Sequence, residues 1–117
     1  MVAYNFQEQF VPLIKSGKKK QTIRKEARCK PGDHMQLYVH QRTPECKKFG
    51  DAVCVDVQKI GLHMNFIELP GVILDQRKCD DFAKADGFSG YSEMILFFEK
   101  QYGSLPFFGH CITWRLK

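Results

Sequence analysis

The sequence predicts a mixed α+β fold, a mostly antiparallel β-barrel with about three short helices at its periphery. Alternating apolar residues indicate four to six short strands, and apolar residues at helical spacing indicate the helices. The strands are not regularly interleaved with helices, which argues against a doubly wound parallel sheet. A chain of 117 residues is long enough for one domain, residues 1–117, and too short for a second independent core.

The first elements are short. Residues 2–6 alternate as a strand, with Tyr4 and Phe6 on one face. A short helix follows, in which Pro12 suits the first turn and Gly17 supplies the stop. Its apolar residues recur at helical spacing: Phe10, Leu13 and Ile14. Residues 21–24 begin the next strand, with Ile23 facing the core.

The middle of the chain contains the clearest strand. Pro31-Gly32-Asp33 predicts a turn that leads into a strand over residues 35–40. Residues 41–51 are predicted to form a charged loop. Residues 52–60 then form a strand in which valines share one face and polar or small residues the other. The valines are Val53, Val55 and Val57, and the opposite face carries Cys54 and Asp56.

The second half predicts two helices and a final strand. Residues 61–76 have the least clear pattern, and their apolar residues can form a short edge strand and a packed loop. Asp80 or Asp81 can cap a short helix that Gly87 ends. Ser89 opens a longer helix closed by Gly103. Its apolar stripe comprises Tyr91, Met94, Ile95, Phe98 and Tyr102. Residues 108–116 form the last strand, which carries Trp114.

Composition predicts a cytoplasmic protein without cofactor or metal. Apolar residues make up 44% and charged residues 26% of the chain, which excludes a disordered protein. No run of about 18 apolar residues and no signal peptide is present, so membrane partners are not expected. The five cysteines are odd in number and widely spaced, which favours reduced thiols over disulfides or zinc. They are Cys29, Cys46, Cys54, Cys79 and Cys111.

Positive charge is concentrated in one stretch. The net charge is +5, and within residues 15–30 only Glu26 opposes the basic side chains. These are Lys15, Lys18, Lys19, Lys20, Arg24, Lys25, Arg28 and Lys30. If they also cluster in space, they would give salt-sensitive affinity for phosphate groups. The alternative is a solvated, charged turn.

The order of motifs along residues 4–116 resembles the ASCH domain, a branch of the PUA-like superfamily. In the first half, a short helix leads into Gly17-Lys18-Lys19-Lys20-Gln21-Thr22-Ile23-Arg24, followed by Pro31-Gly32-Asp33. In the second half, the pattern continues with Asp81-Phe82-Ala83, Asp86-Gly87-Phe88, Phe97-Phe98, Tyr102-Gly103 and Ile112-Thr113-Trp114. The resemblance implies a PUA-like β-barrel beside a cleft formed partly by residues 17–24.

The resemblance also implies a ligand. The superfamily is associated with RNA recognition, and ASCH members include a reported nuclease and small amidohydrolases that deacetylate N4-acetylcytidine. The amidohydrolases assign catalysis to a lysine, a threonine three residues later and a downstream glutamate. On this chain the lysine falls on Lys19 and the threonine on Thr22. The acid falls on Asp86, which would reach about 1.5 Å less far than a glutamate, judging from a carbon–carbon bond length.

The chemistry of such a site places two demands on the fold. Thr22 offers a hydroxyl nucleophile, and Lys19 can act as its base only if its pKa falls well below about 10.4. Repulsion from the neighbouring cations and partial burial would both lower that pKa. A regular strand would place Lys19 and Thr22 on opposite faces, so Lys19 has to belong to the preceding turn. Asp86 is either functional or a local hydrogen-bonding residue at a helix end.

The leading hypothesis is therefore a binding module that recognises RNA or a modified nucleoside. Its binding residues are Lys18, Lys19, Lys20, Thr22 and Arg24. The alternative is a metal-independent amidohydrolase acting on N4-acylated cytidine through Lys19, Thr22 and Asp86, and a nuclease is less favoured. A third hypothesis, a subunit that binds another protein, would need an exposed apolar patch around Phe107-Phe108. A monomer is favoured. Tyr4, Phe6, Phe107 and Phe108 are either core residues or platforms for base stacking.

Overall fold

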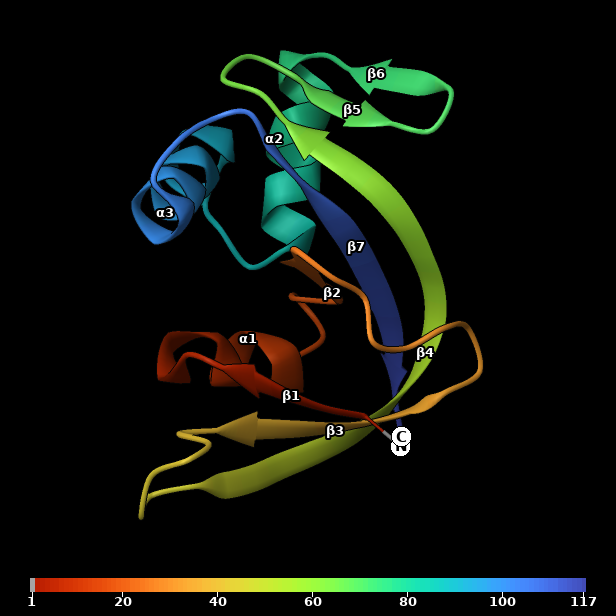
Figure 1. The fold of residues 1–117 in the computed structure, drawn as a ribbon, viewed down its shortest axis with the longest axis vertical. Coiled ribbons are helices and arrows are strands. Elements are labelled where there is room, and N and C mark those ends of the chain that lie inside the picture. The colour runs from red at the N-terminus through yellow and green to blue at the C-terminus, as the bar shows by residue number, and fades with distance from the viewer. Residues whose placement is uncertain (1) are drawn as a thin grey trace.

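The computed structural model describes residues 2–117, which form a curled, half-barrel sheet of mostly antiparallel strands and three short α-helices (Figure 1). The strands are β1 (Val2–Phe6), β2 (Gln21–Arg24), β3 (His34–Val39), β4 (Lys47–Leu62), β5 (Ile67–Leu69), β6 (Val72–Leu74) and β7 (Phe107–Leu116). The helices are α1 (Val11–Lys15), α2 (Gln76–Ala85) and α3 (Tyr91–Tyr102), and a 3₁₀ turn, Glu8–Phe10, precedes α1.

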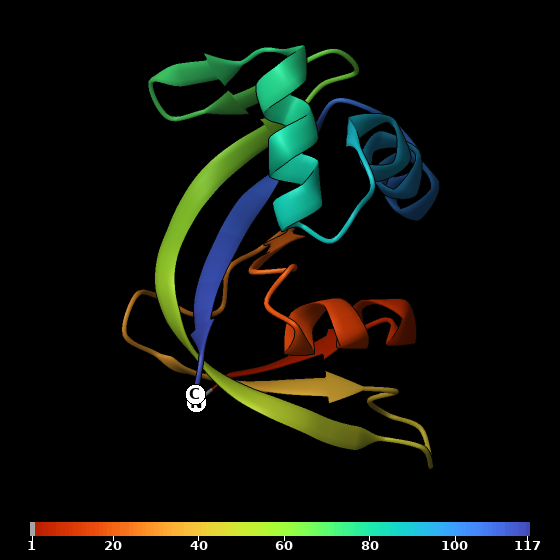
Figure 2. The same ribbon diagram turned by 180° about the vertical axis from the view of Figure 1, so that it is seen from behind.

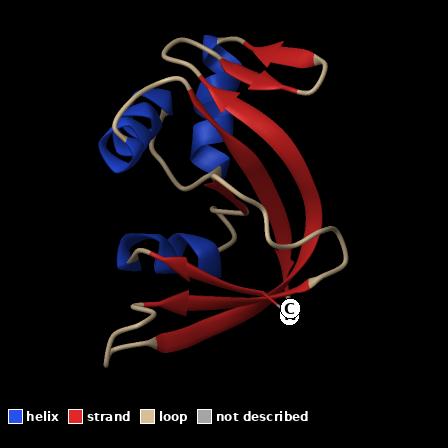
Figure 3. Ribbon diagram, viewed as in Figure 1, coloured by secondary structure: helices blue, strands red, loops and turns tan. Residues whose placement is uncertain are grey.

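The long strand β4 organises the sheet. Its first half pairs with β3, its second half pairs with β7, and its end pairs with β5. On the far side of β7 lies β2, and on the far side of β3 lies β1. Within residues 2–117 the β1–β3 pair is parallel and every other pair is antiparallel. The β4 ribbon therefore bends through the whole height of the molecule, which curls the sheet (Figure 3).

All three helices lie within the curve of the sheet, as the front and back views agree (Figures 1 and 2). The core lies between them and the sheet. It includes Tyr4 and Leu37 from the sheet and Ile14, Met94 and Phe98 from the helices, all at most 3% exposed. Helix α1 lies near β1, whereas α2 and α3 lie toward the other end of the curve (Figure 1). The segments that join these two parts carry the functional side chains described below.

Several predicted elements are confirmed. Strand β1 buries Tyr4 and Phe6 on one face, and Ile23 of β2 faces the core. Pro12 lies in the first turn of α1, and Gly17 follows that helix with φ +84°, a conformation that favours glycine. Gly103 likewise caps α3 in the left-handed region.

The predictions for the strands need three corrections. Seven strands form, against the four to six expected, because the ambiguous segment 61–76 supplies the β5–β6 hairpin. Residues 47–51 belong to β4 and not to a loop, because they pair with β3. The predicted alternation within β4 is wrong beyond Cys54, where a bulge between Cys54 and Asp56 shifts the register against β7. Val55 is 46% exposed at this bulge.

The predictions for the helices need two corrections. The cap of α2 is Asp75, whose side chain accepts a hydrogen bond from the Lys78 N–H, and neither Asp80 nor Asp81. Helix α3 begins at Tyr91, two residues after Ser89, and Tyr102 at its end is 42% exposed instead of buried in the apolar stripe. None of the helices in residues 2–117 has the length and apolarity needed to cross a membrane.

Candidate functional site

Buried polar side chains gather in one place. Across residues 2–117, the buried polar or charged residues are Lys19, Gln21, Thr22 and Asp86, each at most 8% exposed. Burying a charged or hydrogen-bonding group away from water is unfavourable unless it finds a partner. Four such residues within one neighbourhood, two of them ionisable, therefore indicate a functional site.

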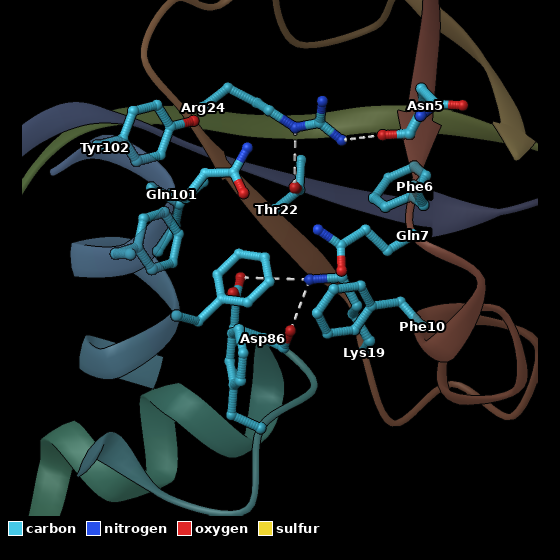
Figure 4. Close-up of a pocket in the computed structure, with 14 residues that line it drawn as sticks. Asn5, Phe6, Gln7, Phe10, Lys19, Thr22, Arg24, Asp86, Gln101 and Tyr102 are labelled. Atoms are coloured by element: carbon cyan, nitrogen blue, oxygen red, sulfur yellow. Dashed lines mark hydrogen bonds and ion pairs between the residues drawn. The ribbon is translucent and has the colours of Figure 1, made fainter. Parts of the chain in front are cut away.

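Three of these residues line a cavity of about 230 Å³ (Figure 4). We call it the central pocket. It lies between the end of β1, strand β2, the α2–α3 connection and α3. Its lining consists of Asn5, Phe6, Gln7, Phe10, Lys19, Thr22, Ile23, Arg24, Asp86, Phe88, Phe97, Phe98, Gln101 and Tyr102.

The backbone around Lys19 explains how its side chain enters the pocket. The Lys19 N–H donates to the Leu13 carbonyl of α1, and the Lys20 N–H donates to the Ala85 carbonyl of α2. The Lys20 carbonyl accepts from the Trp114 N–H of β7. These bonds fix residues 19–20 in a connection that is neither helix nor strand, between the turn at residues 16–17 and the start of β2 at Gln21. Lys19 and Thr22 thus both line the central pocket, which a regular strand would not allow.

Lys19 and Asp86 form a buried ion pair. The Lys19 Nζ lies 3.6 Å from Asp86 Oδ1 and donates a hydrogen bond of 2.5 Å to the Asp86 main-chain carbonyl. The same ammonium lies 4.8 Å from the centre of the Phe10 ring. Gly87 leaves room for the lysine stem, because a β-carbon at Gly87 would lie 3.0 Å from Lys19 Cδ. Asp86 Oδ1 is buried and, apart from this ion pair, has no hydrogen-bond partner among residues 2–117.

Burial sets the protonation of this pair. Loss of solvent lowers the pKa of the Lys19 ammonium, the Asp86 carboxylate opposes this change, and the Arg24 guanidinium adds to it. Loss of solvent raises the pKa of the Asp86 carboxyl to about 6, although the Lys19 ammonium lowers it in turn. Both shifts favour the uncharged forms. At a given pH, a larger fraction of Lys19 is therefore neutral than of an exposed lysine.

Arg24 orients the Thr22 hydroxyl. Its Nε donates to Thr22 Oγ1 at 3.1 Å, and its Nη2 donates to the Asn5 carbonyl at 2.6 Å (Figure 4). The guanidinium also lies about 5 Å from the ring centres of Tyr4 and Phe6, at 5.2 and 5.0 Å. Because Thr22 Oγ1 already accepts a hydrogen bond from Arg24, its own proton is free to be donated to another group in the pocket.

Aromatic rings and amide side chains complete the pocket. Phe10, Phe88 and Phe97 contact one another, with ring centres 5.3 to 5.9 Å apart. Gln7 and Gln101 point their amide groups toward the cavity from opposite sides (Figure 4). The pocket thus combines apolar rings with a small number of hydrogen-bonding groups, a composition typical of sites for small organic ligands.

The structure separates the predicted site residues into two groups. Lys19, Thr22, Arg24 and Asp86 meet in the central pocket, whereas Lys18 and Lys20 line a neighbouring hollow. The sequence prediction missed the roles of Gln7, Gln101, Tyr102 and the three phenylalanines. The motifs of the resemblance include Phe88, Phe97 and Tyr102, whereas nothing in the sequence indicated a functional role for Gln7, Gln101 or Phe10.

The aromatic residues proposed for base stacking also differ in whether they line the central pocket. Tyr4, Phe6 and Phe107 are buried in the core, and of these three only Phe6 also lines the central pocket. Phe108 is 58% exposed, on a face that does not include the pocket. In the part of the chain that the structure describes, no three His, Cys, Asp or Glu side chains are grouped so that they could hold a metal ion.

Comparisons with known proteins found no relative of this chain. No protein-family model, no curated protein and no solved structure matches this chain. The function therefore has to be inferred from the site itself.

Proposed function

We propose that this chain binds a single modified nucleoside, with its base in the central pocket. The observation that supports this most directly is the shape and lining of the pocket. A volume of about 230 Å³ is below the range of drug-sized sites, roughly 300–1,000 Å³, and suits one base and part of its sugar. The long basic stretch does not line the pocket as a whole, since only Lys19 and Arg24 contribute cations to it.

The lining provides what base recognition requires. Proteins recognise unpaired bases by stacking them on aromatic side chains and by hydrogen bonds to their edges. Phe10, Phe88 and Phe97 supply the rings, and the amides of Gln7 and Gln101 supply both donors and acceptors. The Asp86 carboxyl, which also lines the pocket, is a further buried acceptor for an N–H of the base. The order of elements along the chain is also compatible with a PUA-like barrel of the ASCH type, which we propose as its family.

A second candidate, amide hydrolysis of an N4-acylated cytidine, is favoured by the arrangement of Lys19 and Thr22. In this reaction the neutral form of Lys19, which burial favours by lowering its pKa, takes the Thr22 proton while Thr22 Oγ1 attacks the amide carbonyl carbon. Lys19 then returns the proton to the leaving nitrogen as the C–N bond breaks, which releases cytidine and leaves an acyl ester on Thr22. Water hydrolyses the ester and releases the carboxylic acid. Asp86 positions Lys19 throughout, and Arg24 polarises the carbonyl.

Binding and turnover are tested together. Calorimetric titration of cytidine and N4-acetylcytidine measures affinity, and chromatography of the same mixtures measures the release of cytidine. We expect binding of N4-acetylcytidine by the wild type and loss of turnover in Lys19→Ala and Thr22→Val. Thr113→Val, a strand residue opposite Gln21 and outside the pocket, is the matched control.

The outcomes separate the two candidates. Binding without turnover leaves a nucleoside-binding module and removes the hydrolase. Turnover that both variants abolish and Thr113→Val retains establishes the hydrolase. Absence of both binding and turnover by the folded wild type contradicts the proposal.

A further inference from the structure

The basic stretch directs its lysines to two different places. Lys19 enters the central pocket, while Lys18 and Lys20 on either side of it line a surface hollow of about 690 Å³. Lys84, at the end of α2, lines the same hollow. We call Lys18, Lys20 and Lys84 the lysine triad. The Lys20 N–H bond to the Ala85 carbonyl holds the two contributing segments together, so the triad belongs to one ordered surface.

The hollow of the lysine triad lies next to the central pocket, and Phe88 lines both. A smaller hollow between them shares Phe10, Phe88 and Phe97 with the central pocket. It shares Leu13, Gly87, Phe88 and Glu93 with the hollow of the lysine triad. The three hollows therefore adjoin one another, and we refer to them together as the groove.

The triad carries uncompensated positive charge. All three lysines are exposed, and none of them forms an ion pair with a described residue. Glu93 is the one carboxylate that lines this hollow, and it accepts hydrogen bonds from the Ser89 hydroxyl at 2.7 Å and the Ser89 N–H at 3.4 Å. Three ammonium groups against one carboxylate give the end of the groove a net attraction for anions.

We propose that the lysine triad binds a phosphate group of the ligand whose base occupies the central pocket. This inference rests on the proposed function and narrows its ligand from a nucleoside to a phosphorylated one. A base-sized pocket that adjoins a hollow with three lysines matches the two chemistries of a nucleotide, a stacking base and an anionic phosphate. The phosphate belongs either to a mononucleotide or to the backbone of an RNA strand that lies along the groove.

The test compares ligands that differ only in phosphate. Affinities of N4-acetylcytidine, its 5′-monophosphate, its 3′-monophosphate and a trinucleotide with this base at its centre are measured at two salt concentrations. Charge-assisted hydrogen bonds predict that the preferred phosphorylated ligand binds about tenfold more tightly than the nucleoside. The gain should shrink as salt rises. A preferred monophosphate indicates a mononucleotide, and a further gain with the trinucleotide indicates an RNA strand.

Matched variants assign the effect to the triad. The triple variant replaces each lysine of the triad by glutamine: Lys18→Gln, Lys20→Gln, Lys84→Gln. It should bind the phosphorylated ligand no more tightly than the nucleoside, and its affinity for the nucleoside should be unchanged. Its control, Lys47→Gln, Lys59→Gln, Lys78→Gln, removes the same number of exposed charges outside the groove and should keep the gain. Equal affinities for the nucleoside and all its phosphorylated forms would overturn the proposal while leaving nucleoside binding intact.

A second measurement tests phosphate binding at the lysine triad without any nucleoside. Inorganic phosphate is titrated while amide chemical shifts of the protein are followed by NMR. Saturable shifts at residues 18–20 and 84–87, lost in the triad variant and kept in the control, would support the phosphate site independently. Absence of such shifts, together with absence of any gain from phosphate, would contradict it.

Discussion

The Lys19 ammonium and the Asp86 carboxylate lie 3.6 Å apart, and both side chains are 3% exposed. The pair joins the turn before β2 to the connection between α2 and α3, two segments 67 residues apart. Each partner shifts toward its neutral form because solvent is excluded. A fold that needed only stability would gain as much from two apolar residues at these positions. The pair is therefore best explained by what it offers a ligand in the central pocket.

Removal of one partner should be costly. Lys19→Met leaves the Asp86 carboxyl buried without its cation and is expected to lower the free energy of unfolding by about 3 kcal/mol. The double variant Lys19→Met, Asp86→Asn removes both charges and should cost clearly less than the sum of the two single variants. Urea unfolding measures all four proteins. If the loss in free energy of unfolding of the double variant equalled the sum of the losses of the two single variants, the two side chains would not interact.

The Asp86 carboxyl makes stability depend on pH in a defined direction. Its pKa is about 6 in the folded protein, above the ordinary value of 3.8, so folding favours the protonated form. This contribution is complete below about pH 4 and is lost as the pH rises through 6. The wild type should therefore lose up to about 3 kcal/mol relative to Asp86→Asn between pH 4 and pH 7. A stability difference that stays constant or grows in the opposite direction would contradict the shift.

Arg24 and Arg28 provide a matched pair for testing the pocket. Both guanidinium groups lie over the Tyr4 ring and donate a 2.6 Å bond to a β1 carbonyl, but only Arg24 lines the central pocket. Lysine cannot reproduce the planar, multiply bonded guanidinium. Arg24→Lys should weaken binding of N4-acetylcytidine about tenfold, consistent with the loss of one charge-assisted hydrogen bond. Arg28→Lys should leave that affinity unchanged, and calorimetry distinguishes the two results.

Local patterns in the sequence predicted much of the fold. The alternation in residues 2–6, the glycine stops at Gly17 and Gly103, and the Pro31-Gly32-Asp33 turn depend on neighbouring residues alone. The start of β4 was missed because Lys47, Lys48 and Asp51 are charged, and only pairing with β3 makes this segment a strand. The bulge at Val55 likewise depends on register against β7, which no local pattern encodes.

The site was predicted in part. The density of basic residues singled out Lys19 and Arg24, and the resemblance added Thr22 and Asp86. The separation of Lys19 from Lys18 and Lys20 depends on hydrogen bonds to Leu13, Ala85 and Trp114, which are distant in sequence. The amides of Gln7 and Gln101 carry no sequence signal, because exposed glutamines are common on any protein surface.

The close approach of β7 to β2 should be sensitive to a single methyl group. A β-carbon at Gly109 would lie 2.5 Å from the Arg24 carbonyl oxygen, which is backbone and cannot move aside easily. Gly109→Ala is expected to destabilise the protein by about 2–3 kcal/mol through overpacking. Because the displaced strand carries Thr22 and Arg24, ligand affinity should fall as well. Gly50→Ala, where the nearest atom is Leu37 Cδ1 at 3.6 Å, should be tolerated in both measurements.

The corrected cap of α2 can be checked in the same way. Asp75→Ala removes the acceptor of the Lys78 N–H and should lower thermal stability by about 1 kcal/mol. Asp81→Ala, at an exposed position within the helix, should change it by less than about 0.5 kcal/mol. Equal effects of the two substitutions would contradict the assignment of Asp75 as the cap.

The most direct test of nucleoside binding in the central pocket is an NMR titration of the labelled protein with N4-acetylcytidine. The proposal predicts saturable shifts concentrated at Lys19, Thr22, Arg24, Asp86 and Phe88. Arg24→Lys should weaken them and Arg28→Lys should not. Shifts confined to another surface, such as the face around Phe108, or no shifts at all, would contradict it.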